Sequence, residues 1–113
     1  MAIVIYTSKP KTLLQSIKSA IDEKKIITWE YDEAGDFTHT TSTEQWENRG
    51  WFHPYVSSGI LQFGLLGQKK IEMTKGLYGV YHGRFIEMLL THFDEDFSTV
   101  TATSQIAVNV DDF

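Results

Sequence analysis

The sequence predicts an α+β domain, in which two helices cover one face of a mostly antiparallel sheet of five to seven strands. Short runs rich in β-branched and aromatic residues recur along the chain, as expected of strands. Two longer segments, one near the N-terminus and one at residues 74–93, have the character of helices. Turn-forming residues separate neighbouring runs, as in antiparallel hairpins. The expected order, β-α-β-β-β-β-α-β, fills residues 1–113 as a single domain.

The chain opens with a predicted strand and helix. Residues 2–6 are short, apolar and β-branched, which is typical of a strand buried on both faces. Ser8 fits the N-cap of a helix, and Pro10 fits its first turn. The apolar residues of this helix then follow at helical spacing: Leu13, Leu14, Ile17 and Ile21.

A hairpin is expected next, with strands at residues 26–31 and 37–41 joined by the turn-forming residues 32–36. A symmetric turn places Trp29 opposite His39. The same register pairs the other two aromatic residues, Tyr31 and Phe37. Aromatic side chains then share one face of the hairpin, where each cross-strand pair contributes roughly 0.2–1 kcal/mol.

Residues 42–58 are the least regular part of the sequence. Pro54 argues against a central strand here, because proline cannot donate to a ladder of hydrogen bonds. Disorder is not expected, because the segment holds four large aromatic residues: Trp46, Trp51, Phe52 and Tyr55. We expect the segment to pack against the domain, with a short strand at residues 51–56.

The second half begins with a strand at residues 60–66, in which Leu61, Phe63 and Leu65 share one side. A short strand at 71–73 follows, and Thr74 can cap the second helix. An exposed acidic loop, a strand at 97–103 and a final edge strand at 106–110 complete the chain. This order, a β-α-β-β type with an added hairpin, suits a ferredoxin-like variant, an analogy that implies no function.

The second helix carries three glycines, Gly76, Gly79 and Gly83, although each costs roughly 0.5–1 kcal/mol relative to alanine. They lie along one stripe of an α-helix. The stripe has three explanations: close approach of sheet backbone, room for a ligand or partner chain, or a loop at 74–79 with the helix beginning near Val80. We expect the first, a close-packing helix face.

Composition restricts the partners. The chain has a net charge of −5, which argues against binding to duplex nucleic acid. The absence of cysteine excludes disulfides, thiolate nucleophiles and cysteine metal ligands. The apolar runs are far shorter than a membrane span, and the first residues lack the pattern of a signal peptide. We therefore expect a soluble cytoplasmic protein with no membrane partner.

Reactive side chains concentrate in the second helix, where His82 and Arg84 suit an anion. However, Glu87 lies three residues from Arg84 and offers it an ordinary ion pair. His82 and His92 are about 15 Å apart along a helix axis, too far to bind one metal ion. No Gly-x-Ser-x-Gly motif occurs. The sequence therefore predicts no metal site, no cofactor and no catalytic residue, and it favours a non-enzymatic role.

The aromatic segment is the stronger candidate for a binding surface, because Trp, Tyr and Arg are enriched at interface hot spots. It contains Trp46, Arg49, Trp51 and Tyr55. The same side chains would serve equally well as core, and the sequence leaves this open.

Two hypotheses about function follow. The first is a protein-interaction module that forms homo-oligomers through a sheet edge or the glycine-bearing helix. The alternative is a small enzyme or a protein that binds a small anionic ligand. Its pocket would lie between the second helix and the aromatic segment at residues 46–55, and His53, His82 and Arg84 would converge in it.

Overall fold

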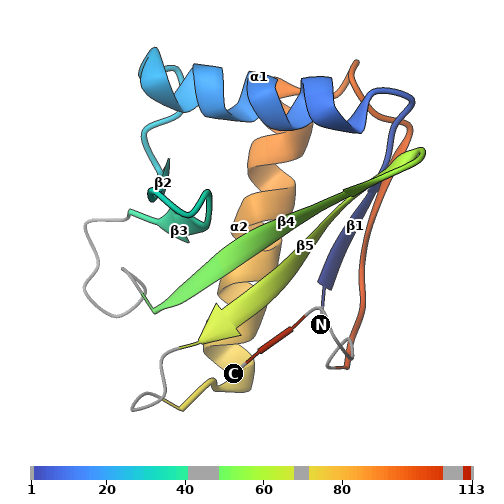
Figure 1. The fold of residues 1–113 in the computed structure, drawn as a ribbon. Helices are drawn as coiled ribbons and strands as arrows, with labels where there is room; N and C mark the ends of the chain where they lie inside the picture. Colours follow the sequence, from blue (N-terminus) through green and yellow to red (C-terminus); the bar gives the residue numbers. More distant parts are fainter. Residues whose placement is uncertain (1, 41–48, 68–71, 106–110, 113) are drawn as a thin grey trace.

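The computed structural model describes residues 2–40, 49–67, 72–105 and 111–112 of the chain. These residues form an antiparallel sheet of six strands in the order β2-β3-β4-β5-β1-β6, with both helices on one face (Figure 1). In chain order the elements are β1 (Ala2–Tyr6), α1 (Pro10–Asp22), β2 (Trp29–Tyr31), β3 (Phe37–His39), β4 (Gly50–Ser57), β5 (Ile60–Gly67), α2 (Lys75–His92) and β6 (Thr99–Ala102). The predicted α+β class and element order are confirmed.

The topology is that of a ferredoxin-like fold with one extra hairpin. Without β2 and β3, the element order is β-α-β-β-α-β and the sheet order is β4-β5-β1-β6. Each helix then connects two strands that have one antiparallel strand between them, the split β-α-β arrangement. The hairpin β2–β3 extends the sheet beyond β4, as the predicted variant requires. The topology alone implies no function.

The hydrophobic core lies between the helices and the sheet face that they cover. Three alternate residues of β5 point into it and are fully buried, as predicted: Leu61, Phe63 and Leu65. The first helix adds Leu13 and Ile17, and the ring of Phe85 in α2 lies 4.7 Å from that of Phe63. Burial of each such side chain contributes about 1.5–3 kcal/mol. These contacts hold both helices against the same side of the sheet.

Strand β4 contains the short strand predicted at residues 51–56, but it corrects the expectation that Pro54 argues against a central strand. It spans Gly50–Ser57, lies inside the sheet and pairs with β5 along its whole length, although it contains Pro54. The physical reason is that β3 pairs with β4 only at Phe37 and Phe52. Beyond Phe52, the edge of β4 that faces away from β5 has no paired strand among the described residues, so a missing N–H at Pro54 costs no ladder hydrogen bond.

The hairpin has the predicted register, with Trp29 opposite His39 and Tyr31 opposite Phe37. Its first strand is shorter than predicted, because it begins at Trp29 rather than at residue 26. Lys24 adopts a left-handed backbone conformation, with φ of 62°, so the chain leaves α1 through a turn before the hairpin starts. The predicted end at residue 41 lies outside the described residues.

Several other ends of strands and helices differ from those that the sequence predicts. Strand β6 is shorter than the predicted 97–103, and the predicted edge strand at 106–110 lies outside the described residues. Of the predicted short strand at 71–73, the described residues 72 and 73 are not in a strand. At the start of α1, Lys9 rather than Ser8 is the N-cap, with no side-chain cap hydrogen bond. Thr74 does cap α2, because its hydroxyl accepts the N–H of Leu77 at 3.1 Å.

The glycines of α2 face outward. Because α2 begins at Lys75, the loop explanation for residues 74–79 is wrong. The expectation that sheet backbone approaches the stripe is also wrong: a Cβ atom built at Gly79 or Gly83 meets nothing within 4 Å, and Gly76 is exposed. The helix packs on the sheet through its opposite side, which carries Tyr81 and Phe85. Only the second explanation, room for a ligand or partner, is left.

Candidate interaction surface

The sheet has one face without a helix, and that face is the candidate functional surface. Successive strand residues point to opposite faces, so the burial of Leu61, Phe63 and Leu65 against the helices turns their neighbours outward. The register then assigns the outward positions of the neighbouring strands. We call this the open face and define it by its larger side chains: Val4, Tyr6, Trp51, His53, Tyr55, Ile60, Gln62 and Leu66.

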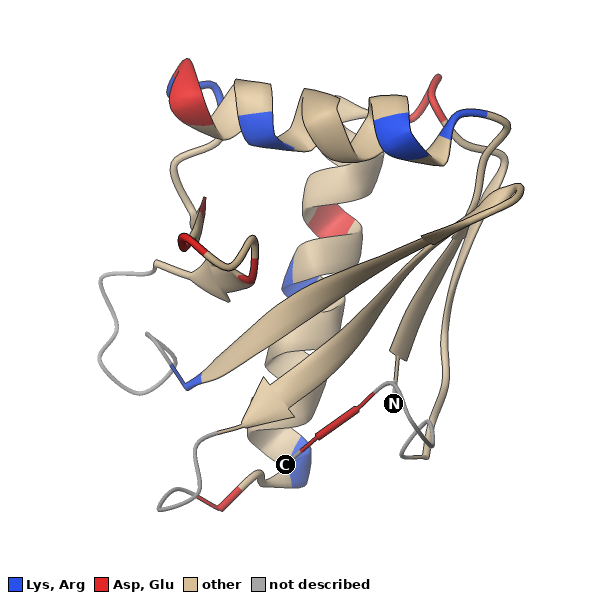
Figure 2. Ribbon diagram, viewed as in Figure 1, with Lys and Arg blue, Asp and Glu red and all other residues tan. Residues whose placement is uncertain are grey.

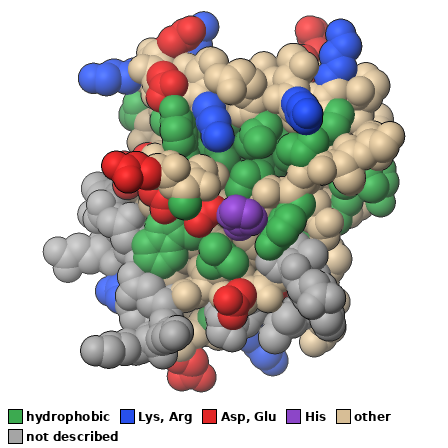
Figure 3. Space-filling view, viewed as in Figure 1, with side chains coloured by type: hydrophobic (Ala, Val, Ile, Leu, Met, Phe, Trp, Pro, Cys, Tyr) green, Lys and Arg blue, Asp and Glu red, His purple; other side chains and the backbone are tan. Residues whose placement is uncertain are grey.

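The open face is rich in aromatic and aliphatic side chains. Tyr6 is 43% exposed and Tyr55 is 37% exposed, while Trp51 is half-buried. The rings of His53 and Tyr55 lie 5.0 Å apart at an interplanar angle of 72°, an edge-to-face contact. Figure 3 shows this side of the molecule, where hydrophobic side chains lie over the strands. An antiparallel sheet with a solvated face normally carries polar side chains there.

Ionised side chains are absent from the strands that form this face. Strands β1, β4, β5 and β6 contain no Asp, Glu, Lys or Arg. Figure 2 shows the charged residues on the helices, the hairpin turn and the loops instead. Among the described residues, the four strands that form the open face therefore contribute nothing to the charge of the chain.

One polar contact at this face joins the hairpin to the sheet. Nδ1 of His53 in β4 lies 2.5 Å from Oδ1 of Asp36, which precedes β3. The Asp36 side chain is only 13% exposed, so this contact is largely shielded from water. His53 therefore positions the β2–β3 turn beside the open face.

The predicted site residues of the 46–55 segment lie in different parts of the structure. Trp46 lies outside the described residues. Arg49 meets α2 through its backbone, because its N–H donates to the hydroxyl of Tyr81 at 3.0 Å. Trp51, His53 and Tyr55 come together on the open face. The structure thus shows three of these side chains on one surface, where the sequence left core and surface open.

The predicted pocket does not form among the described residues. His82 is a buried residue of α2. Its ring stacks on that of Tyr78 at 3.8 Å, and its Nδ1 lies 2.9 Å from the carbonyl oxygen of Tyr78. Arg84 is exposed and pairs with Glu87 at 3.3 Å, as the spacing suggested. His53 lies on the other side of the sheet. The three side chains that the alternative hypothesis required therefore do not converge.

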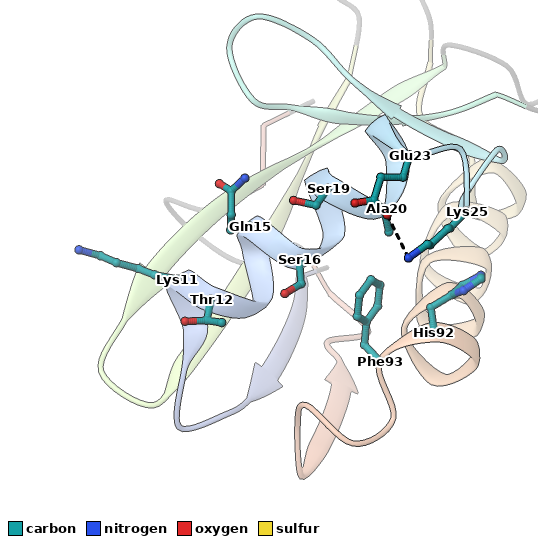
Figure 4. Close-up of a pocket in the computed structure, with 10 residues that line it drawn as sticks. All are labelled: Lys11, Thr12, Gln15, Ser16, Ser19, Ala20, Glu23, Lys25, His92 and Phe93. Carbon is teal, nitrogen blue, oxygen red and sulfur yellow. Dashed lines mark ion pairs between the residues drawn. The ribbon is translucent and has the colours of Figure 1, made fainter.

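A cavity lies elsewhere, between α1 and the C-terminal end of α2 (Figure 4). Its volume is about 580 Å³, and its wall on α1 carries Thr12, Ser16 and Ser19. At one end Lys25 pairs with Glu23 at 3.0 Å, and both side chains are well exposed. This shallow hollow contains none of the predicted site residues. Sequence reasoning missed it, because it forms where two helices distant in the chain diverge.

Two titratable side chains of the hairpin have shifted pKa values. The hydroxyl of Tyr31 donates to the Asp22 carboxylate at 2.7 Å, and this hydrogen bond raises the pKa of Tyr31. Burial lowers the pKa of His39, and the nearby charge of Arg84 adds to the effect. Neither residue belongs to the open face. No group of three His, Asp or Glu residues in the described part of the chain could hold a metal ion.

The chain was compared with protein-family models, with curated proteins and with solved structures, and none of them matches it. Within the described residues, no helix has the length and apolar character needed to cross a membrane. Function is therefore inferred from the chemistry of the surface.

Proposed function

We propose that this protein is a non-enzymatic interaction module that self-associates through the open face. One observation carries the proposal: Tyr6, Trp51 and Tyr55 lie on a sheet face with no helix over it and no ionised residue in its strands. Aromatic residues dominate interface hot spots, and charged residues are depleted at interface centres. Exposed apolar patches on such a face commonly mark interaction sites.

A second copy of the chain suits this surface in size. Four strands spaced about 4.8 Å apart, each up to eight residues long, give a projected area of up to roughly 500 Å². The accessible area of a face covered by side chains exceeds its projection. Two such faces therefore approach the lower end of the roughly 1,200–2,000 Å² that stable complexes bury.

A second copy also suits the surface in charge. Two chains with a net charge of −5 repel each other, but the four strands that form the face contain no charged residue. Salt screens the repulsion between charges that lie farther apart than the Debye length of about 8 Å at physiological ionic strength. Two sheets can then stack face to face about 10 Å apart with interdigitated side chains.

Sedimentation equilibrium of three proteins tests the proposal: the wild type, Tyr55→Lys and Ile27→Lys. We expect a concentration-dependent dimer for the wild type. A charge at Tyr55 should raise the dissociation constant by up to roughly 1,000-fold, because each hot spot contributes about 2 kcal/mol, or about 30-fold, and a symmetric interface contains the residue twice. Ile27 is the matched control, since it is 75% exposed and lies outside the open face. Strictly monomeric wild type at millimolar concentration would refute self-association.

The other predicted routes of association give different results. Association through α2 would be weakened by Gly79→Gln and Gly83→Gln, which fill the open space beside the helix, and not by Tyr55→Lys. Association through the outer edge of β2 or of β6 would also survive Tyr55→Lys, because this substitution leaves these two strands unchanged. The pattern of variants therefore separates the three surfaces.

We also propose that the partner is a protein and not duplex nucleic acid. We further propose that the protein is cytoplasmic. The acidic balance of the chain disfavours a phosphate backbone. A chain without cysteine needs no oxidising compartment for its stability. Gel-shift titration with duplex DNA at low salt, and fractionation of cells, check these two points.

A further inference from the structure

We propose that the hairpin β2–β3 is a pH-sensitive element: protonation of His39 releases it from α2 and β4, while the rest of the sheet stays folded. His39 ends β3 and is only 4% exposed. Its Nδ1 is buried and has no hydrogen-bond partner in the described part of the chain. A buried polar atom without a partner is rare enough in folded proteins to require an explanation.

The neutral imidazole fits its surroundings, and the imidazolium does not. The ring of Trp29 meets that of His39 at 4.9 Å and 69°, and the ring of Tyr81 lies 6.1 Å away. In the neutral ring, the nitrogen without a proton tolerates this apolar contact. After protonation both nitrogens carry N–H groups and a positive charge, and the buried Nδ1 has no acceptor among the described residues.

The charged groups near His39 come from α2. Arg84 opposes the imidazolium through its own positive charge, while Glu87 partly offsets this. Burial has the largest effect on the pKa of His39. Burial and the charge of Arg84 together outweigh the effect of Glu87, so the pKa of His39 is lowered. The residues of β2 and β4 that pack on the same side, Trp29 and Phe52, are uncharged.

The hairpin is also the part of the sheet with the fewest backbone links. It pairs with β4 at one residue pair, Phe37 and Phe52, whereas β4 and β5 pair at eight positions. Where β3 and β4 separate, the hydroxyl of Tyr81 lies between them. It accepts the N–H of Arg49 and lies 3.5 Å from the hydroxyl of Thr38.

The buried side chains of Trp29 and Phe37 and the contact of His53 with Asp36 also hold the hairpin. Opening therefore requires the loss of all these contacts, while the pairing of β4, β5 and β1 can stay intact.

The direction of the pH effect follows from the lowered pKa. In the open state His39 has an ordinary pKa of about 6.5, and in the closed state its pKa lies below this. Above about pH 6.5 both states are neutral and the opening equilibrium is constant. Below it, opening rises by up to tenfold per pH unit, until the pKa of the closed state is reached.

Amide hydrogen exchange followed by NMR tests the proposal on the wild type. A detached hairpin of three-residue strands does not persist in water, so its amides exchange when it opens. After correction for intrinsic rates, protection of Glu30 and Thr40, whose N–H groups face across the hairpin, should fall several-fold between pH 7 and pH 5.5, in step with the NMR titration of His39. Protection in β1 and β5 should stay constant. Equal loss of protection in the hairpin and in β5 would overturn the proposal, because it would show global unfolding.

His39→Phe provides the matched variant, since phenylalanine keeps an aromatic ring against Trp29 and cannot be protonated. Its hairpin should show no pH dependence in the same range. His92→Gln, which removes an exposed histidine, should behave as the wild type does. A hairpin that still opens below pH 6.5 in His39→Phe would also overturn the proposal. If that variant does not fold, the wild-type titration decides alone.

Discussion

The imidazole of His53 and the ring of Tyr55 meet edge to face, 5.0 Å apart, on the side of the sheet opposite both helices. The two residues alternate along β4, and Trp51 precedes them on the same face. Charge-free strands surround them. This combination supports the proposal that the open face binds a partner, because a solvated face of an antiparallel sheet normally carries polar side chains.

The glycines of α2 should be replaceable at no cost to folding. Gly79→Ala and Gly83→Ala should each increase the free energy of unfolding by about 0.5–1 kcal/mol, because the added methyl group meets open space and alanine favours the helix. Urea denaturation measures this. Gly59→Ala is the contrasting control and should destabilise, since Gly59 has a φ of +74°. Destabilisation by both helix substitutions would show that these positions are not open.

Tyr81→Phe should destabilise the protein by about 1–3 kcal/mol. The substitution removes the hydroxyl that accepts the N–H of Arg49 at 3.0 Å and leaves that donor without its partner in a partly buried place. Chemical denaturation measures the effect. Tyr6→Phe removes an exposed hydroxyl and should stay within about 0.5 kcal/mol of the wild type. Equal effects of the two substitutions would contradict a bridging role for Tyr81.

Thr74→Ala should destabilise α2 by roughly 1 kcal/mol, because the Thr74 hydroxyl caps the N–H of Leu77. Thr91 lies exposed in the last turn of the same helix, and Thr91→Ala should be neutral or slightly stabilising. The difference between the two thermal midpoints isolates the cap from helix propensity. A Thr74→Ser variant, which keeps the hydroxyl, should recover most of the loss.

Local patterns in the sequence identify most of the fold. Alternation places Leu61, Phe63 and Leu65 inside, and the symmetry of the turn pairs Trp29 with His39. Pro54 argues wrongly against a central position for β4, because the sequence does not reveal that β3 pairs with β4 at a single residue pair. Whether a proline costs a hydrogen bond depends on the neighbouring strand and not on the proline itself.

The surface is harder to predict than the fold. Glycine spacing on α2 identifies a stripe correctly but not the side that it faces, because Tyr81 and Phe85 decide which side of the helix is buried. Trp51, His53 and Tyr55 alternate within the strand predicted at residues 51–56, so they share one face of that strand. Pro54 argues against a place for this strand inside the sheet, and the sequence therefore does not show that the strand helps to form the open face.

Dilution of the isotope-labelled protein, followed through its amide NMR shifts from millimolar to micromolar concentration, tests the central claim most directly. If the protein self-associates through the open face, we expect concentration-dependent shifts at Trp51, His53 and Tyr55 and along β5 and β1, with the shifts of residues 76–83 of α2 unchanged. Shifts confined to α2, or spectra that do not change over the whole range, would contradict self-association through the open face.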